Sequence, residues 1–310
     1  MSGYAVVDFQ TTGLAAKKHD RIVELAITHL DRTGRFEGTW ETVINPEHIV
    51  DPPAGLTAAE LAAAPTFAQI LPPLAYLLNG RVLVAHNASF HTGFLLAELK
   101  RAGYKTPQTT VLCTMQLAGE LLPQSGRSLY ECCATCGVAL TDPQRAAANS
   151  AASAALLGTY ISNSPTWDVW GKSLAAADVP WPVPVGEQVD WLPRGTRPPA
   201  ETTFLQRVSA KLPGHAGPAE ELDYLALLDR ALLDMQVTAD EGAELTELAI
   251  ALGLTPQRCI ELHSMYFDQL AAAAWSDGVL TLDEMNQLVA VGSVLRIPAG
   301  HVQNVMSANR

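Results

Sequence analysis

Long apolar runs are missing from this sequence of 310 residues, although 48% of its residues are hydrophobic. No segment holds the 18 or more consecutive apolar residues that a membrane-spanning helix requires. The N-terminus also lacks the basic stretch followed by an apolar stretch that a secretion signal would show. We therefore expect no membrane association and a cytoplasmic location. The length favours two compact domains over one.

Cysteine is scarce, and its number is odd. With no secretion signal, an odd number indicates reduced thiols rather than a disulfide framework. Cys133 and Cys136 have the spacing of a zinc-binding pair, but no second pair completes a tetrahedral site. We interpret them as core thiols of an apolar helix over residues 128–138, with metal or redox use as the alternative. The five residues are Cys113, Cys132, Cys133, Cys136 and Cys259.

Positive charge is also scarce, because 20 Lys and Arg face 32 Asp and Glu for a net charge of −12. Residues 1–163 carry a net charge of −2, residues 164–218 are neutral, and residues 219–310 carry −10. An acidic segment repels phosphate backbones. Any nucleic-acid contact is therefore expected in the first two-thirds of the chain, and a protein partner is the candidate ligand of the acidic last third.

What is present begins with an apolar run at residues 4–7, which predicts a strand. Asp8 follows it, and Thr11, Thr12 and Gly13 predict a turn. A carboxylate at the end of a buried strand needs a compensating partner, because burying an unpaired charge is costly. A metal ion is one such partner. Further strands are predicted at residues 20–30, 34–44 and 81–85, between helical segments, which indicates an α/β domain.

The stretch at residues 4–14 resembles the first motif, V-x-D-x-E-T-T-G-L, of the 3′–5′ exonucleases related to the proofreading subunit of bacterial DNA polymerase III. Asp8 matches the Asp of the motif, but Gln10 stands where the family has Glu. Residues 86–91 resemble the second motif, H-N-A-x-F-D, with His91 in place of its Asp.

The third motif of the family, H-R-A-L-x-D-A-x-x-T-A, is matched without gaps by residues 144–154. Gln144 replaces the His of this motif and Asn149 replaces its Asp. The resemblance covers residues 4–160. It implies a ribonuclease-H-like exonuclease fold, in which helices flank a mixed sheet.

Two-metal cleavage of a phosphodiester needs several carboxylates around two cations roughly 3.5–4 Å apart, and a general base for the attacking water. The five matching positions here are Asp8, Gln10, His91, Gln144 and Asn149. One of four carboxylates remains, and the base is absent. Amide oxygens are poor substitutes for the charged oxygens that Mg²⁺ prefers. We therefore expect no intact catalytic set and no metal, and a need for Mg²⁺ or Mn²⁺ only if the protein is active.

Asp8 and His91 are the residual candidates for one transition metal, since imidazole with carboxylate suits zinc or manganese. The simpler expectation is that His91 hydrogen-bonds Asp8 or lies at a wet cleft. The resemblance also implies nucleotide contacts at the turns of the first two motifs. Single-stranded nucleic acid or a nucleotide is the expected ligand of this cleft. The residues carried over as nucleotide contacts are Thr11, Thr12, Leu14, His86 and Asn87.

The rest of the chain divides by composition. Residues 1–163 form the expected exonuclease-like domain, and residues 164–218 form a strap rich in Pro and Trp. Residues 219–310 form an all-α domain with a repeat offset of 43 residues, in which Asp234, Thr238 and Glu241 return as Asp277, Thr281 and Glu284. This part resembles helical domains of the tellurite-resistance type.

Three hypotheses follow for function. The first is an inactive exonuclease-like protein that binds a nucleic-acid end, a nucleotide or a protein. The second is an active 3′–5′ exonuclease with an atypical metal site. The third is a regulatory or scaffold protein without a nucleotide ligand.

Overall fold

The computed structural model describes residues 3–53, 55–106, 108–177, 179–184, 190–195, 204–215, 217–233 and 237–307. The chain divides into two compact units. The first contains residues 1–121 and 132–200, and the second contains residues 122–131 and 201–310. Residues 164–200 of the strap therefore group with the first unit. In the described residues, no helix is long and apolar enough to cross a membrane.

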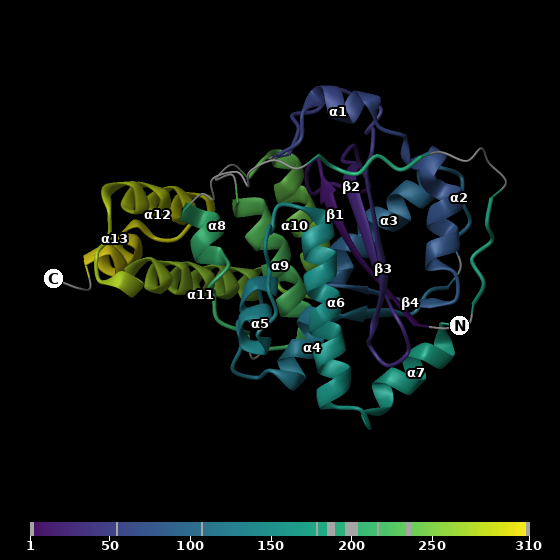
Figure 1. Cartoon of the computed structure of the whole chain (residues 1–310). Helices are drawn as coiled ribbons and strands as arrows, with labels where there is room; N and C mark the ends of the chain where they lie inside the picture. Colours follow the sequence, from purple (N-terminus) through teal and green to yellow (C-terminus); the bar gives the residue numbers. More distant parts are fainter. Residues whose placement is uncertain are drawn as a thin grey trace. The chain divides into compact units, whose positions relative to one another are not determined.

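The first unit is built on one mixed sheet in the order β3-β2-β1-β4-β5 (Figure 1). The pairs β1–β2 and β2–β3 are antiparallel, whereas β1–β4 and β4–β5 are parallel. All nine residues of β2 are buried, as expected for a strand inside a covered sheet. The strands are β1 (Gly3–Thr11), β2 (Ile22–Leu30), β3 (Phe36–Val43), β4 (Arg81–Ala85) and β5 (Val111–Cys113).

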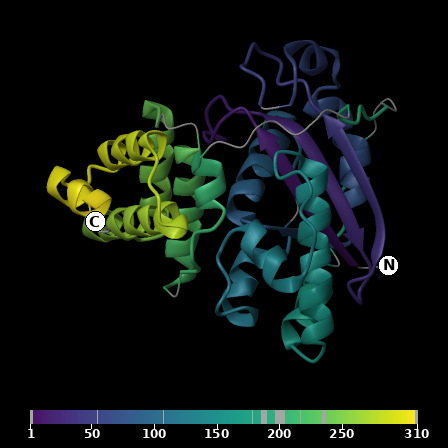
Figure 2. The same cartoon turned by 60° about the vertical axis from the view of Figure 1, so that its left-hand side comes forward.

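Helices cover this sheet, and α6 runs alongside strands β1–β3 (Figure 2). Helix α3 packs on β1, β2 and β4. The expected α/β fold with a mixed sheet flanked by helices is thus confirmed. The helices of the first unit are α1 (Ala58–Ala63), α2 (Phe67–Leu78), α3 (Ala88–Arg101), α4 (Thr114–Leu121), α5 (Leu129–Cys136), which crosses the boundary between the units, α6 (Ala146–Asn163) and α7 (Asp168–Ala176).

The strap contains a helix that its proline content did not predict. Helix α7 fits because residues 166–179 contain no proline. Further on, the backbone of Leu192 pairs with the edge strand β3. Its carbonyl accepts from the N–H of Val43 at 2.8 Å, and its N–H donates to the Thr42 hydroxyl at 3.0 Å. This pairing covers one end of an otherwise open sheet edge.

The thiols of α5 lie in the core of the first unit. Cys132 and Cys133 are buried and Cys136 is partly buried, and in the described part of the chain none of the three forms a disulfide. Burial, with a smaller contribution from the neighbouring thiols, raises the pKa of Cys133 to about 12. A thiol that stays protonated at neutral pH is a poor nucleophile and a poor metal ligand.

The second unit is helical, and the repeat is a structural one. Thr238 and Thr281 are the N-caps of α10 and α12, each in a capping box with the Glu three residues on. The C-caps of the two helices are equivalent leucines, Leu252 and Leu295. Asp234 of the first copy lies outside the described residues. The helices are α8 (Phe204–Ser209), α9 (Ala219–Leu232), α10 (Ala239–Ala251), α11 (Pro256–Ala274), η1 (Trp275–Asp277), α12 (Leu282–Val294) and α13 (Ala299–Ser307).

Candidate functional site

Strand β1 places Asp8 and Gln10 on the same side of the sheet, because side chains two residues apart on a strand share a face. Asp8 pairs with Ala26 of β2, and Gln10 pairs with Glu24. Only 4% of Asp8 is exposed, so its carboxylate depends on protein partners rather than on water.

Three nitrogen atoms surround the carboxylate of Asp8. The amide nitrogens of Gln10 and Asn149 donate to Oδ2 at 3.4 and 3.3 Å. Nε2 of His91 lies 3.4 Å from Oδ1. Each of these residues occupies a position where the family motif has a carboxylate. In place of three anions, the Asp8 carboxylate therefore faces two amide groups and one imidazole.

The orientation of His91 follows from its second nitrogen. The N–H of Phe9 donates to Nδ1 at 3.3 Å, so the proton of the neutral ring is on Nε2, the atom that faces Asp8. His91 has no exposed surface, and the rings of Phe9 and Phe90 meet it edge-on. Of the two expected environments for His91, the structure therefore has the contact with Asp8 and not the wet cleft.

Gln144 is held through its main chain, in the turn that precedes α6. Its N–H donates to Asp142 at 3.2 Å, and its carbonyl accepts from Nη1 of Arg194 at 2.9 Å. The sequence alignment put this position inside a helix, but α6 begins only at Ala146. Asn149 therefore lies in the first turn of α6.

Sequence reasoning missed a buried ion pair beside this site. Nη1 of Arg194, from the strap, lies 2.9 Å from Oε2 of Glu24 on β2, and the N–H of Ala146 donates to Oε1 at 3.3 Å. Burial raises the pKa of the Glu24 carboxyl, and the Arg194 guanidinium offsets part of that rise. The signal was present as a lone Glu within the apolar run of β2.

The donor set does not fit two divalent cations. Asp8 is the one carboxylate of the set, and the nearby Glu24 carboxylate already binds a guanidinium. Among the described residues, no group of three or more His, Cys, Asp or Glu could hold a metal ion. Oδ1 of Asn149 is buried without a hydrogen-bond partner in the described structure, but a single neutral oxygen does not replace the missing anions.

Two of the expected nucleotide contacts, Thr11 and Thr12, have hydroxyl groups that form hydrogen bonds within their own loop. The Thr12 hydroxyl donates to Asp20 at 2.7 Å and accepts from the N–H of Arg21 at 3.0 Å, so it stabilises its own loop. The Thr11 hydroxyl donates to the Gly13 carbonyl at 2.8 Å. A Cβ on Gly13 would lie 2.5 Å from Oδ2 of Asp20, which explains the glycine. Both threonines are partly exposed.

The other expected contacts are more buried. Leu14, His86 and Asn87 are 8%, 9% and 6% exposed. Nδ1 of His86 lies 3.0 Å from the Thr114 hydroxyl. Asn87 precedes α3 in a left-handed conformation with φ 61°, and its side chain does not cap the helix. Whether any of these residues contacts a nucleotide remains a prediction.

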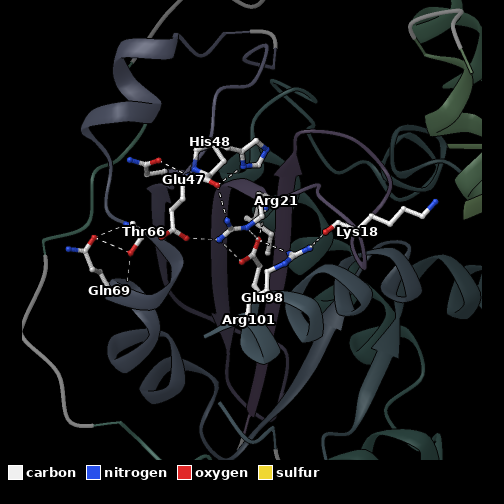
Figure 3. Close-up of polar contacts among 11 residues, drawn as sticks. Lys18, Arg21, Glu47, His48, Thr66, Gln69, Glu98 and Arg101 are labelled. Atoms are coloured by element: carbon white, nitrogen blue, oxygen red, sulfur yellow. Dashed lines mark hydrogen bonds and ion pairs between the residues drawn. The ribbon is translucent and has the colours of Figure 1, made fainter. Parts of the chain in front are cut away.

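A second polar cluster anchors the loop between β1 and β2 (Figure 3). Arg21 binds the buried carboxylate of Glu98 at 2.7 and 3.0 Å and also binds Glu47 at 2.9 Å. Arg101 contacts the same Glu98 at 3.3 Å. Because Arg21 also bonds to Thr12, this cluster holds the turn that follows the first motif.

Comparison with known proteins relates the first half of the chain to exonucleases. The RNase_T exonuclease family model matches residues 5–154. A putative bifunctional exonuclease/endonuclease protein of Mycobacterium tuberculosis is 38% identical over 127 residues, which are 38% of this chain and 20% of that protein. The DNA polymerase III subunit epsilon of Treponema pallidum is 33% identical over 131 residues, which are 41% of this chain and 60% of that protein.

Among solved structures, the nuclease domain of 3′hExo has a TM-score of 0.47 and 16% identity, over 52% of this chain and 92% of that one. The family match ends at residue 154, so it gives no support to the tellurite-resistance resemblance of residues 219–310. Residues 5–154, just under half of this chain, resemble the RNase_T exonuclease family.

Proposed function

We propose that this exonuclease-family domain does not cleave phosphodiesters and instead binds the end of a nucleic-acid strand. The observation that carries the proposal is the set of nitrogen atoms of Gln10, Asn149 and His91 around the Asp8 carboxylate. A cation needs the lone pairs of such a carboxylate, and here N–H groups point at them. The polar network is built to hold Asp8 without a metal.

The replacements conserve shape while they change charge. Gln for Glu and Asn for Asp keep the size of the side chain, so the cleft keeps its fold when its anions are lost. A catalytic site of this family would need Mg²⁺ or Mn²⁺, which bridge and neutralise the phosphate oxygens. Without them, binding has to come from hydrogen bonds and from basic side chains.

Nucleic acid is the favoured ligand class because the matching family model is an exonuclease model, and the two relatives are by name an exonuclease/endonuclease protein and a DNA polymerase III subunit. The chain spans a fifth and three-fifths of the length of these two relatives, so their complete activities are not transferred with the match. The accessible threonines of the first motif, Thr11 and Thr12, are the polar groups expected to meet a strand end.

A nuclease assay tests the loss of catalysis. We expect a 5′-labelled single-stranded DNA or RNA to keep its length in the presence of the protein with Mg²⁺ or Mn²⁺. Shortening that the near-isosteric Asp8→Asn variant abolishes would overturn the proposal and favour an active exonuclease with an atypical site. Shortening that persists in this variant points to a contaminating nuclease, and the preparation is then repurified and retested.

A reconstruction variant tests the cause of inactivity. Gln10→Glu, His91→Asp, Gln144→His and Asn149→Asp together restore the family pattern, and we expect Mn²⁺-dependent shortening from this protein. The same variant with Asp8→Asn is the matched control. If the reconstructed protein remains inactive while folded, residues outside these five positions also prevent catalysis.

A binding titration separates this proposal from a scaffold without a nucleotide ligand. We expect a labelled single strand to bind with an affinity that falls as salt is raised, because phosphate contacts release counterions. Fluorescence anisotropy measures this directly. If the strand does not bind even at low salt, the proposed binding function is wrong, and the scaffold without a nucleotide ligand is the remaining hypothesis.

For the acidic second unit we propose a protein partner. Leu282 and Val289, seven residues apart on α12, are 71% and 50% exposed, and Asp283 and Glu284 lie beside Leu282. Apolar side chains among acidic ones fit a basic amphipathic segment. In-cell cross-linking should join the wild-type protein to partners that a Leu282→Ser/Val289→Ser variant no longer contacts. An unchanged cross-linking pattern would show that Leu282 and Val289 are not part of a partner-binding surface.

A further inference from the structure

Helix α6 of the first unit has an outer face without charge. None of its 18 residues is Asp, Glu, Lys or Arg. Ala151, Ala155, Gly158 and Ser162 follow one another at helical spacing and form one stripe, which we call the α6 stripe. Gly158 is half-buried, and the other three residues are exposed. A surface helix normally carries charged residues toward solvent, so this composition is typical of a face that another element covers.

A groove with a volume of about 730 Å³ runs along the α6 stripe. Its second wall is the hairpin between β2 and β3, which ends beside the C-terminal half of α6 (Figure 1). The backbones touch there, because a Cβ on Gly158 would lie 2.7 Å from the carbonyl oxygen of Gly34. Phe36, the first residue of β3, lines the groove and is 67% exposed. The groove therefore combines a small-residue floor with an exposed aromatic ring.

The hydroxyl groups that line the groove donate within the protein. Those of Thr159 and Ser162 donate to carbonyls one turn earlier in α6, at 3.0 and 2.8 Å. The Thr33 hydroxyl donates to the Asp31 carboxylate at 2.7 Å. A site for a small polar molecule has a few polar groups that converge on the ligand. Because these donors are used locally, the groove suits an apolar surface better than a small polar molecule.

Two arginines give the rim of the groove its charge. Arg35 lines the groove, Arg32 lies in the same hairpin, and both are exposed. In the described part of the chain, neither guanidinium forms a hydrogen bond or an ion pair. Asp31 lies near Arg35, but its carboxylate accepts hydrogen bonds from the hairpin backbone, and Glu37 pairs with Arg81 at 2.7 Å. The rim therefore keeps a net positive charge, in a chain whose net charge is −12.

We propose that this groove binds an acidic amphipathic helix of another protein. Small residues along the α6 stripe allow a second helix to approach at the short end of the usual separation of about 8–10 Å. The apolar face of the bound helix packs on the α6 stripe and on the ring of Phe36. Its carboxylates pair with Arg32 and Arg35. None of the residues that line the groove belongs to the cluster at Asp8, so this inference is independent of the proposed nucleic-acid binding.

Photo-cross-linking in cells identifies the bound segment. The full chain carries p-benzoylphenylalanine in place of Ser162, or in place of Ala59 on α1 as the control position, and both residues are exposed. We expect the probe at Ser162 to capture a segment of another protein with net negative charge and apolar residues at helical spacing, which mass spectrometry of the joined peptides locates. No adduct, a basic segment, a second copy of this chain, or the same segment captured from Ala59 would overturn the proposal.

A titration with the synthetic form of the captured segment tests the chemistry of the groove. In fluorescence anisotropy, Arg32→Glu/Arg35→Glu should bind it about 5- to 30-fold more weakly through the loss of two rim ion pairs, and added salt should reduce this difference. The matched control, Lys105→Glu/Lys211→Glu, makes the same change of charge at two exposed lysines elsewhere. Ala155→Gln should weaken binding by about 10-fold because its longer side chain separates the helices, and Ala59→Gln is its control.

Each comparison can refute one part of the proposal. If Arg32→Glu/Arg35→Glu binds the segment as tightly as wild type, or no more weakly than the lysine control, the rim does not recognise an acidic partner. If Ala155→Gln binds as tightly as Ala59→Gln, the partner does not lie on the α6 stripe. Either result overturns the proposal. Because all the substituted residues are exposed, unchanged thermal unfolding confirms that the variants are folded.

Discussion

Replacing Asn149 by Asp should destabilise the first unit, because it exchanges a donor for a second anion. Nδ2 of Asn149 lies 3.3 Å from Oδ2 of Asp8. Two unit charges at that distance repel each other by about 5 kcal/mol at an effective dielectric constant of 20. Protonating one carboxyl is the alternative, and at pH 7.5 it costs about 5 kcal/mol over roughly 3.6 pH units. Relaxation and bound counterions reduce the net loss, which we expect to be about 2–4 kcal/mol.

The free energy of unfolding of the Asn149→Asp variant should depend on pH in a defined direction. Repulsion raises the pKa of the carboxyl pair in the folded state above its unfolded value. The folded state then binds more protons, so the variant is most stable at low pH and loses stability as pH rises. At pH 5, protonating one carboxyl costs only about 1.5 kcal/mol, so the loss should shrink to that size.

Thermal unfolding of Asn149→Asp in EDTA, at pH 5 and at pH 7.5, measures both effects. A loss of about 3 kcal/mol lowers the Tm of a unit of this size by roughly 6–12 °C. Asn149→Ala removes the donor without adding charge, and Asn163→Asp adds a charge at the far end of α6. If Asn149→Asp is no less stable than Asn149→Ala at pH 7.5, the amide of Asn149 does not hold the Asp8 carboxylate, and the reasoning is wrong.

Three further predictions concern parts of the fold around the site and in the second unit. Arg194→Met should lower the free energy of unfolding by about 3–5 kcal/mol, because it leaves the Glu24 carboxylate buried without its guanidinium. Adding Glu24→Gln should recover most of this loss. Urea unfolding followed by tryptophan fluorescence measures both changes, and a double variant as unstable as Arg194→Met alone would contradict the prediction. Burial lowers the pKa of His29 to about 4, below its unfolded value of about 6.5, so the unfolded state binds more protons between these values. The unfolding free energy should therefore fall by on the order of 1–2 kcal/mol as pH is lowered from 6.5 to 4. His29→Gln should flatten this decrease, and parallel curves of unfolding free energy against pH for both proteins would show that His29 is not its cause. Arg296 follows α12 in a left-handed conformation with φ 57°, and the equivalent residue of the first repeat is Gly253 with φ 72°. Arg296→Gly should stabilise α12 by about 1 kcal/mol and slow its hydrogen exchange, and Gly253→Arg should have the opposite effect on α10. Unchanged exchange would show that the left-handed conformation of Arg296 is not strained.

The strands and most helices of the first unit could be predicted because each carries its own local signal. The run at residues 81–85 became β4 with the same bounds. Thr238 and Glu241, which recur in the repeat, formed a capping box at the start of α10. Helix α7 was not predicted, because the density of proline was averaged over a segment whose prolines lie outside the helix.

The candidate site was predictable only as a set of positions. The motifs brought Asp8, Gln10, His91 and Asn149 together, and the structure places all four in one cluster. The contribution of Arg194 could not be predicted, because a pair separated by 170 residues has no local pattern. It depends on where the strap returns to the sheet, and that path is set by tertiary packing.

In the proposed function, the same exchange of charge that removes the metals also makes the cleft compatible with phosphate. A carboxylate 6 Å from a phosphate oxygen repels it by about 3 kcal/mol at an effective dielectric constant of 20, and four of them would exclude a strand unless cations were present. Here one carboxylate remains, and it faces the nitrogen atoms of Gln10, Asn149 and His91. The three substitutions therefore act as a set, since restoring any one anion without its metal would weaken both the fold and the binding of a strand. This coupling predicts that Asn149→Asp, which destabilises the unit in EDTA, also binds labelled oligo(dT) more weakly than Asn149→Ala does. Binding that is equal in the two variants would separate the network at Asp8 from the strand-binding function.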